Sequence, residues 1–275
     1  MHISQPSVSI QVSDLERSLS VELFEQLGKR IYLTDAGRVL EDYAQRVLTL
    51  VDEAQEAVAE VTELHRGRLA VGASTTPGTY LLPRVLGRYE ERFPKIAVTL
   101  EIANTRRIQE RLLRSELDVG VVGWVASSQN FVTQPLLDDE LVVVVGPRHP
   151  LVAAGGMPVA ALRDYRLILR ERGSGTREVI ETALRRVELE LTPAMELGSM
   201  EAIKEAVAEG LGITILSPLA VASEIAAGRL AIVPLTDMVL KRAFSIIYHR
   251  DKRLSPAMQV FLEMLRASVM AATNN

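Results

Sequence analysis

The sequence predicts an α/β protein of two lobes, preceded by a small helical segment with a β-wing and by one long helix. Three observations predict this fold class. Apolar residues recur at helical spacing near the N-terminus, a heptad pattern runs through residues 40–64, and from Arg68 onward buried strands alternate with helices. Strands that alternate with helices form a largely parallel sheet, which binds ligands at the carboxyl ends of its strands.

The first predicted element is a helix with one apolar face. Ser4 is a suitable N-cap, and Pro6 is tolerated in the first turn because its missing N–H would be unpaired there. The apolar face consists of Val8, Val12, Leu15 and Leu19. The opposite face carries polar groups that can reach base edges and phosphates when a helix lies in a major groove, namely Gln5, Ser7, Ser9 and Gln11.

A short β-wing with a basic tip is expected next. Lys29 and Arg30 follow Gly28 at this tip, between the apolar run 19–24 and an alternating strand at 31–33. Thr34 and Asp35 then offer an N-cap for a long helix that extends to about His65.

Several short motifs carry a resemblance to a known family. They are ISQPSVS at 3–9, Leu15-Glu16, Leu23-Phe24, Leu33-Thr34 and Ala36-Gly37. This pattern resembles the winged helix-turn-helix of LysR-type transcriptional regulators, and the resemblance extends over nearly the whole chain. It implies a partial winged helix-turn-helix over residues 1–36 that contacts double-stranded DNA through Ser4, Gln5, Pro6, Ser7, Ser9, Gln11, Lys29 and Arg30.

Two departures from the family pattern concern the DNA-binding segment. Where the family places basic residues, this chain has Ile10, Ser13, Asp14 and Gln26, so fewer phosphate contacts are expected. The family also has a first helix that packs behind this segment, and this sequence starts after it. Without that support, buried aliphatic side chains worth about 1.5–3 kcal/mol each lose covering surface. We therefore expect a misassigned start, a shortened form or a truncated paralogue, with a poorly ordered or DNA-incompetent N-terminal segment.

Composition limits the function classes. A chain of 275 residues with 48% hydrophobic content can bury a sizeable core in one to three domains. Because it contains no cysteine, thiol redox sensing and cysteine-ligated metals are excluded. The sequence has no apolar run long enough for a membrane span and no secretory leader, which predicts a cytoplasmic protein without a membrane partner. The net charge of −4 does not by itself suggest DNA.

Residues 37–66 are expected to form a linker and dimerisation helix. Its apolar positions alternate spacings of three and four, at Leu40, Tyr43, Val47, Leu50, Ala54, Ala57, Val61 and Leu64. Four glutamates line the outside, which argues against contact of this helix with DNA. The alternative is a helix packed on its own chain. The resemblance implies a homodimer or homotetramer, with RNA polymerase as a further partner.

Residues 67–275 are expected to form the two lobes. The predicted elements are strands at 69–73, 97–102, 117–122, 140–145, 167–170, 210–216 and 244–250, with helices at 74–93, 105–114, from 173 and at 255–267. The resemblance implies an effector-binding domain of two Rossmann-like lobes of the periplasmic-binding-protein type, lobe I at about 67–145 and 238–275 and lobe II at about 146–237. Crossings near Val145–Gly146 and Asp237 would form a hinge.

A ligand site is predicted where two strands lead into helices. Ser74, Thr75 and Thr76 follow a strand and offer hydroxyls and free N–H groups at a helix N-terminus, and the segment 173–176 repeats the arrangement. Two such ends facing one cleft would hold a small anion, whereas the alternative is that each Ser or Thr is only an N-cap. With the positions that the resemblance implies, the candidate set is Ser74, Thr75, Thr76, Asn104, Gly123, Trp124, Arg170, Ser174, Thr176, Ser199 and Met200. For Trp124, a place as a rim or core aromatic is the alternative.

The predicted function is a ligand-responsive, DNA-binding transcriptional regulator. The strings VGASTT, YLLPR and RERGSGTR resemble the branch of sulfur-metabolism and carbon-fixation regulators, which implies a coinducer that is an inorganic oxyanion or a small carboxylate or phosphate metabolite. No cofactor or metal is expected. A solute-binding protein, a truncated regulator that binds effector but not DNA, and an enzyme are the alternatives. The enzyme is poorly supported because the four histidines are dispersed and Ser174 has no evident base.

Overall fold

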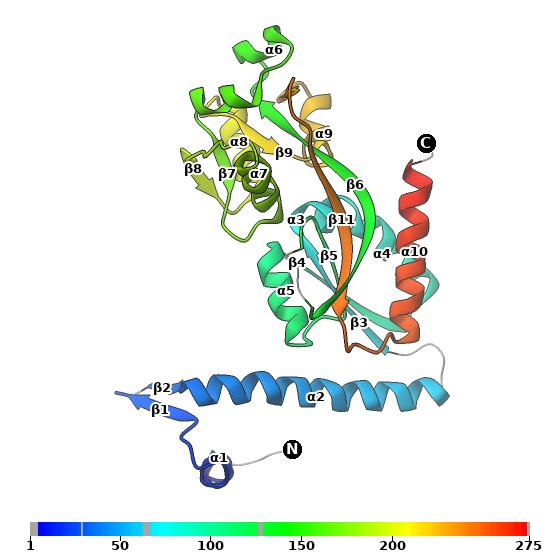
Figure 1. Ribbon diagram of the computed structural model, residues 1–275. Helices are drawn as coiled ribbons and strands as arrows, with labels where there is room; N and C mark the ends of the chain where they lie inside the picture. Colours follow the sequence, from blue (N-terminus) through cyan, green and yellow to red (C-terminus); the bar gives the residue numbers. More distant parts are fainter. Residues whose placement is uncertain (1–4, 29, 63–66, 126–128, 274–275) are drawn as a thin grey trace. The chain divides into compact units, whose positions relative to one another are not determined.

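The chain forms two compact units, Met1–Val58 and Ala59–Asn275, hereafter unit 1 and unit 2 (Figure 1). This computed structural model describes residues 5–28, 30–62, 67–125 and 129–273. Each unit has its own fold.

Unit 1 contains the predicted helix, wing and start of the long helix. Its elements are α1 (Gln5–Leu19), the antiparallel pair β1 (Phe24–Leu27) and β2 (Arg30–Leu33), and α2 (Asp35–Thr62), which continues into unit 2. The proposed N-cap Ser4 and the tip residue Lys29 lie outside the described residues.

Thr34 and Gly37 stabilise the junction between the wing and the long helix. The Thr34 hydroxyl accepts a hydrogen bond from the Gly37 N–H (3.0 Å), which caps the start of α2, and donates to the Glu22 carbonyl (2.7 Å). A Cβ at Gly37 would lie 2.1 Å from the carbonyl oxygen of Leu23, so only glycine allows α2 to approach this backbone. Leu23 is buried at the junction.

Both long apolar faces of unit 1 are exposed. On α1, Val8, Leu15 and Leu19 are 43–47% exposed, although the sequence pattern predicted a buried face. On α2, Tyr43, Val47 and Leu50 of the predicted heptads are 59–64% exposed. These side chains are therefore available to further protein surface, since burying them would be favourable.

Unit 2 has two lobes, the first of which is a sheet covered by helices. Its strands are β3 (Gly67–Ser74), β4 (Ile96–Ala103) and β5 (Val119–Val122), which are mutually parallel in the order β5-β3-β4. Its helices are α3 (Thr75–Tyr80), α4 (Leu82–Arg92), α5 (Thr105–Leu113) and α10 (Pro256–Thr273). The core lies between the sheet, α4 and α10, where the rings of Tyr89 and Phe261 meet edge to face.

The second lobe is built from short strands and helices. They are α6 (Pro150–Ala154), the 3₁₀ helix η1 (Val159–Asp164), β7 (Ile168–Arg170), α7 (Gly175–Arg185), β8 (Met195–Leu197), α8 (Met200–Ala208), β9 (Thr214–Leu216), α9 (Pro218–Ala226) and β10 (Ala231–Val233). β7 and β8 pair in parallel.

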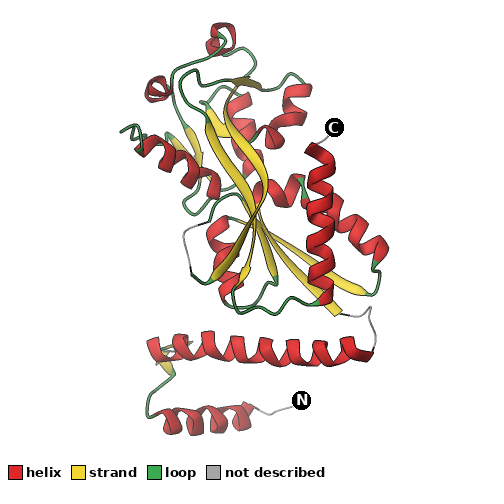
Figure 2. Cartoon of the chain, turned by 45° about the vertical axis from the view of Figure 1, so that its right-hand side comes forward, coloured by secondary structure: helices red, strands yellow, loops and turns green. Residues whose placement is uncertain are grey.

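Two long antiparallel strands run through both lobes, β6 (Phe131–Val145) and β11 (Leu240–His249) (Figure 2). β11 pairs with β5 in the first lobe, and the end of β6 pairs with β9 and β10 in the second. Leu141, Val143 and Val145 already belong to the second lobe's core. The crossings between lobes therefore lie within these strands, not in the segments near Val145–Gly146 and Asp237 that were expected to cross.

Two predicted elements differ most clearly from the structure, and each has a local cause in the backbone. The helix expected at 74–93 breaks into α3 and α4 at Leu81, because Pro83 has no N–H to continue the hydrogen-bond ladder. The strand expected at 210–216 begins only at Thr214. Gly210 has a positive φ of 76°, and Gly212 passes so close to Arg166 that a Cβ would lie 2.3 Å from its carbonyl oxygen.

Candidate functional site

A polar pocket lies between the two lobes of unit 2. It is lined by the ends of β3, β4 and β7, by the starts of α3, α5 and α7, and by one residue of β11. The lining residues are Ser74, Thr75, Thr76, Asn104, Thr105, Arg170, Ser174, Gly175, Thr176 and Arg242. Carboxyl ends of strands and N-termini of helices thus meet here, as the alternation of elements predicts.

The serines at two of these helix starts do not cap their helices. Ser74 and Ser174 occupy the N-cap positions of α3 and α7, but neither side chain forms a capping hydrogen bond. The Ser74 hydroxyl instead accepts from the Gly123 N–H of the neighbouring strand end (3.2 Å). Asn104 does cap α5, accepting from the Arg107 N–H (3.0 Å). For the two serines, the alternative of a simple N-cap does not fit the geometry.

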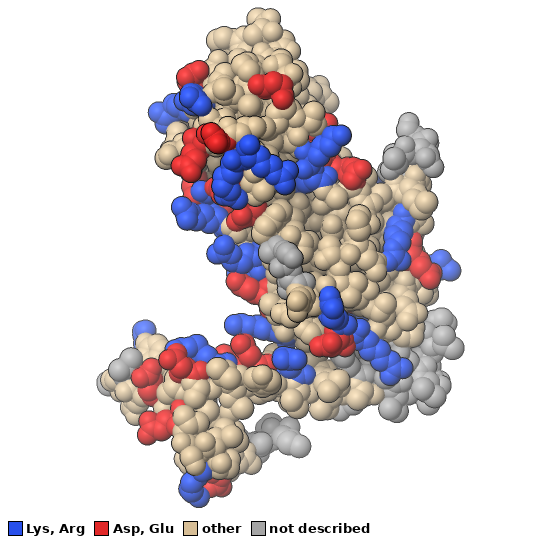
Figure 3. All heavy atoms as spheres, in the orientation of Figure 1, with Lys and Arg blue, Asp and Glu red and all other residues tan. Residues whose placement is uncertain are grey.

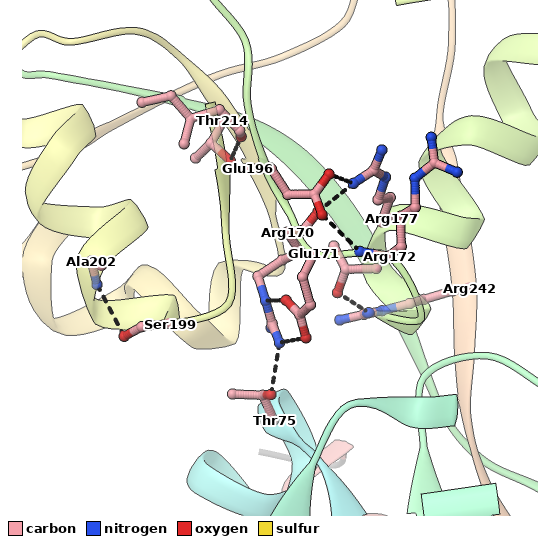
Figure 4. Close-up of polar contacts among 12 residues, drawn as sticks. Thr75, Arg170, Glu171, Arg172, Arg177, Glu196, Ser199, Ala202, Thr214 and Arg242 are labelled. Atoms are coloured by element: carbon pink, nitrogen blue, oxygen red, sulfur yellow. Dashed lines mark hydrogen bonds and ion pairs between the residues drawn. The ribbon is translucent and has the colours of Figure 1, made fainter. Parts of the chain in front are cut away.

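Arg170 joins the two lobes across the pocket. Its Nη2 donates to the Thr75 hydroxyl of the first lobe (3.1 Å), while Nε and Nη2 donate to the two carboxylate oxygens of Glu171 (2.8 and 3.1 Å; Figure 4). The Arg170 side chain is 5% exposed. A buried guanidinium of this kind needs a negative partner, which Glu171 provides.

Arg177 holds the end of β7 in place behind this contact. Its guanidinium donates to the Arg170 carbonyl (3.1 Å) and pairs with Glu181 and Glu196. Burial alone would lower the pKa of Arg177, but the hydrogen bonds to the two carboxylates outweigh burial and raise it. The hydrogen bond that Arg177 donates to Glu196 also lowers the pKa of Glu196. The backbone that carries Arg170 is therefore fixed by a charged network.

Arg242 of β11 forms the buried side of the pocket. Its Nε pairs with Asp139 of β6 (2.7 Å), its Nη1 donates to the Thr176 hydroxyl (2.8 Å), and its guanidinium lies over the Phe244 ring at 4.7 Å. Burial, and more weakly the charge of Arg170, lower its pKa, whereas Asp139 opposes this shift. Asp139 is in turn held by the Ser217 hydroxyl (2.8 Å).

Two buried donors at the pocket are unused. Within the part of the chain that the structure describes, Arg242 Nη2 and Thr105 Oγ1 have no hydrogen-bond partner. Leaving a buried polar atom unpaired is costly, and most such atoms in proteins are satisfied. A ligand with several acceptor oxygens would satisfy both.

The lobes also meet at a second cluster, formed by Tyr80 of α3 with Lys204 of α8 and Glu224 of α9. The Tyr80 hydroxyl donates to the Ala220 carbonyl (3.2 Å), and Lys204 Nζ contacts both that hydroxyl (3.3 Å) and Glu224 (2.8 Å). Burial would lower the pKa of Lys204, but hydrogen bonds to Glu201 and Glu224 raise it overall. Burial would raise the pKa of Glu224, but the contact with Lys204 lowers it.

Most predicted ligand residues converge on the pocket. Those that line it are Ser74, Thr75, Thr76, Asn104, Arg170, Ser174 and Thr176. Gly123 and Trp124 adjoin it, since a Cβ at Gly123 would touch Arg242 and one at Gly175 would touch Trp124. Ser199 and Met200 are outside the lining set: Ser199 is exposed and caps α8 by accepting from the Ala202 N–H, and Met200 is buried in the second lobe's core.

Three lining residues were missed in the sequence. Thr105 directly follows Asn104 at a helix start, so the rule used for Ser74 would have found it. Gly175 lies inside the Gly-Ser-Gly-Thr string that was singled out. Arg242 had no local signal, because its carboxylate partner Asp139 is 103 residues away on β6.

The proposed DNA-contacting residues lie in α1 and the wing. Gln5 and Pro6 are in the first turn of α1, and Ser7, Ser9 and Gln11 follow on the same helix with exposed side chains. Arg30 is exposed at the start of β2. On the side of unit 1 that Figure 3 shows, basic and acidic side chains are interspersed.

The described residues also bear on membrane and metal binding. No helix among them is both long and apolar enough to span a bilayer. The ranges that the structure covers likewise hold no cluster of three or more His, Asp or Glu side chains that could bind a metal ion.

Comparison with known proteins gives matches along the whole chain. The family described as "LysR substrate binding domain" matches residues 62–269, and "Bacterial regulatory helix-turn-helix protein, lysR family" matches residues 1–38. The transcriptional activator CmpR of Synechocystis sp. is 37% identical over 97% of this chain and 88% of its own length. The RuBisCO operon transcriptional regulator of Acidithiobacillus ferrooxidans is 37% identical over 98% of this chain and 86% of its own.

Solved structures match the same regions. The CcmR regulatory domain of Synechocystis PCC6803, solved in complex with 2-PG, is 36% identical with a TM-score of 0.69, over 74% of this chain and 98% of that domain. A full-length OxyR variant from Pseudomonas aeruginosa is 27% identical with a TM-score of 0.73, over 98% of this chain and 86% of the OxyR chain. These similarities cover both the helix-turn-helix and the two lobes.

Proposed function

The chain belongs to the LysR family of bacterial transcriptional regulators, and from this premise we propose that it senses a small anionic metabolite in the pocket between its lobes. The observation that carries the proposal is the pair of buried donors, Arg242 Nη2 and Thr105 Oγ1, that have no partner in the described residues and lie beside Arg170. Guanidinium and hydroxyl groups at helix starts are the donors that bind carboxylates and phosphates.

The proposed effector is a metabolite that combines phosphate and carboxylate oxygens. The relative CcmR was solved with 2-PG (2-phosphoglycolate), and its regulatory domain is 36% identical to this chain. Two buried arginines from different elements suit a ligand with an anionic group at each end. The proposed contacts are Ser74, Thr75, Thr76, Asn104, Arg170, Ser174 and Thr176, with Gly123 and Trp124 beside them, and the geometry adds Thr105 and Arg242. Ser199 and Met200, which the sequence also suggested, are left out because they lie outside the pocket. No cofactor or metal enters this proposal.

The proposed output is a change in DNA binding by an oligomer. Residues 1–36 would contact an operator, residues 37–66 would pair two chains, and residues 67–275 would bind the effector. The exposed heptad residues of α2 support pairing, because a dimer would bury them. The effector can act only if it binds one arrangement of the lobes more tightly than the other. We place this regulator in the cytoplasm, with RNA polymerase as a further partner.

A double variant tests the ligand site. Thr75→Ala with Thr176→Ala removes the hydroxyls that accept from Arg170 and Arg242. Because both hydroxyls line the pocket, each is also a proposed donor to the anionic ligand, and a hydrogen bond to a charged group contributes roughly 1.5–3 kcal/mol. The Kd for 2-phosphoglycolate should therefore rise at least about tenfold. Isothermal titration calorimetry measures this change, while a gel shift without effector should be unaltered.

Two exposed threonines provide a matched control. Thr99 lies on β4 of the first lobe and Thr192 precedes β8 of the second, and both are exposed. Changing both to alanine should leave the Kd at its wild-type value. An unchanged Kd in the Thr75/Thr176 variant would refute the proposed site.

A further inference from the structure

The pocket is too small for the effector proposed above. Its cavity volume is about 10 Å³, which is room for a single water molecule at most. A ligand the size of 2-phosphoglycolate therefore requires protein groups to move. The following inference rests on the proposed function, because it concerns which group moves.

The charges of the two buried arginines are already cancelled by carboxylates. Glu171 binds two nitrogens of Arg170, and Asp139 binds Arg242 at 2.7 Å. The four side chains together carry no net charge. A dianion that enters this set gains little electrostatic attraction unless one carboxylate leaves.

The two carboxylates differ in how firmly they are held. Asp139 is 5% exposed and also accepts a hydrogen bond from Ser217. Glu171 is 24% exposed, and the contacts of its carboxylate within the described chain are both to Arg170. Glu171 can rotate into solvent and be hydrated there, whereas Asp139 would have to leave a buried network.

We propose that the Glu171 carboxylate is an internal competitor that occupies the anion position of Arg170 until an effector displaces it. Figure 4 shows the two oxygens of Glu171 against the guanidinium, with Thr75 of the other lobe at the same guanidinium's Nη2. The guanidinium that the effector would take over from Glu171 is thus the same group that binds Thr75 of the other lobe. Effector binding is therefore coupled to the contact between the lobes.

This arrangement determines which ligands bind. A carboxylate tethered to the neighbouring residue has an effective concentration on the order of millimolar or higher. Weak monoanions do not compete with it, whereas a phosphate dianion that can also reach Arg242 does. Glu171 is therefore a specificity-determining residue that selects dianions.

The test uses the full chain with Glu171→Gln. Glutamine keeps the size of the side chain and loses its charge, so we expect 2-phosphoglycolate to bind at least about tenfold more tightly than to wild type. Wild type should bind the monoanion glycolate only weakly, and we expect the affinity for glycolate to increase in this variant by at least the same factor. Isothermal titration calorimetry measures both ligands. Glu190→Gln removes an exposed glutamate of the same lobe that does not contact Arg170, and it should leave both Kd values unchanged.

A second variant separates displacement from a general effect of charge. Glu171→Asp keeps the negative charge, but its shorter side chain cannot reach both nitrogens of Arg170. Tighter binding of 2-phosphoglycolate to Glu171→Asp supports displacement, because net charge is unchanged. It also gives an answer if Glu171→Gln does not fold.

The outcomes distinguish this inference from the proposed function. If wild type binds 2-phosphoglycolate and the folded Glu171 variants bind it equally or more weakly, the competitor is overturned while the ligand site stands. If neither wild type nor the variants bind 2-phosphoglycolate or inorganic phosphate, the proposed anion site fails and this inference fails with it.

Discussion

At the scale of single residues, Arg242 connects three parts of the molecule that are distant in sequence. It pairs with Asp139 of β6, donates to Thr176 of α7 and lies over Phe244 of its own strand. Its charge is buried together with that of Asp139, so each of the two depends on the other for compensation.

We predict that Arg242→Ala strongly destabilises the protein. Removing one member of a buried ion pair leaves the other uncompensated and typically costs about 3–5 kcal/mol. Urea unfolding followed by circular dichroism measures this loss. Lys241→Ala, a change at the exposed neighbour on the same strand, should have little effect. Equal stability of the two variants would contradict a structural role for the Arg242–Asp139 pair.

Gly175 permits the close approach of the two lobes. A Cβ at this position would lie 2.6 Å from Thr105 Oγ1 and 3.2 Å from the Trp124 backbone nitrogen, both in the first lobe. The Trp124 backbone nitrogen cannot rotate away from the added methyl group, so Gly175→Ala should hold the lobes apart. Trp124 is the single tryptophan, so its fluorescence reports directly on this contact.

We predict a red shift of the Trp124 emission in Gly175→Ala, as the indole environment becomes more hydrated. The expected cost in unfolding free energy is that of overpacking, about 1–3 kcal/mol at most. Gly198→Ala is the control, since no atom lies within 4 Å of the added Cβ. An emission spectrum identical to wild type in Gly175→Ala would show that the lobes tolerate the extra carbon.

At the scale of elements, helices α3, α8 and α9 meet at the buried cluster of Tyr80, Lys204 and Glu224. The pKa of Glu224 is lowered in the folded protein, so its contribution to stability is present above its ordinary pKa of 4.5 and is lost as pH falls through the folded value. The pKa of Lys204 is raised, so its contribution is lost only in strongly alkaline solution.

We therefore predict an acid-side loss of stability that depends on Glu224. In wild type the free energy of unfolding should decrease as pH falls below about 4.5, and Glu224→Gln should flatten this slope while lowering stability at pH 7 by about 1–3 kcal/mol. Denaturant unfolding across pH 3–7 measures both effects. The exposed Glu209→Gln should retain the wild-type slope, and a parallel slope in Glu224→Gln would exclude this cluster as its origin.

Elements with a strong local pattern were predicted from the sequence, and long-range pairings were not. The helix α2 and the strand-to-helix junctions at Ser74 and Ser174 depend on neighbouring residues. The heptad spacing and the change from an apolar strand to a Ser/Thr/Gly string were therefore sufficient signals, although neither serine caps its helix. The first half of β6 was missed because its residues do not form a continuous apolar run and include Pro135. The pairing of Asp139 with Arg242 depends on the register of β6 with β11, which no local signal fixes.

At the scale of the whole molecule, the proposed pairing of two chains depends on the exposed apolar row of α2. The described part of α2 presents Tyr43, Val47 and Leu50 with most of their side-chain surface exposed. An apolar row of this kind on a long helix is a surface for a second helix.

We predict that Leu50→Glu separates the oligomer and weakens operator binding. A charge in an apolar helix seam is strongly unfavourable when buried, so sedimentation velocity should show a shift towards monomer. Gln45→Glu places the same charge on the same exposed helix without changing an apolar residue and should leave the oligomer intact. If Leu50→Glu sediments as the same oligomer as wild type, the contact between chains lies elsewhere.

The two strands that run through both lobes make unit 2 a single cooperative body. β6 and β11 supply Val132 and Ile246 to the first lobe's core, and Leu141 and Leu240 to the second's. Unfolding one lobe would disorder β6 and β11 and so remove core side chains from the other lobe. We therefore expect the two lobes to unfold together. Backbone amides along this ribbon should therefore exchange with deuterium only when the whole unit unfolds, even while amides at the pocket exchange rapidly. If the pocket opens for an effector as proposed, the ribbon would keep both lobes folded while it does so.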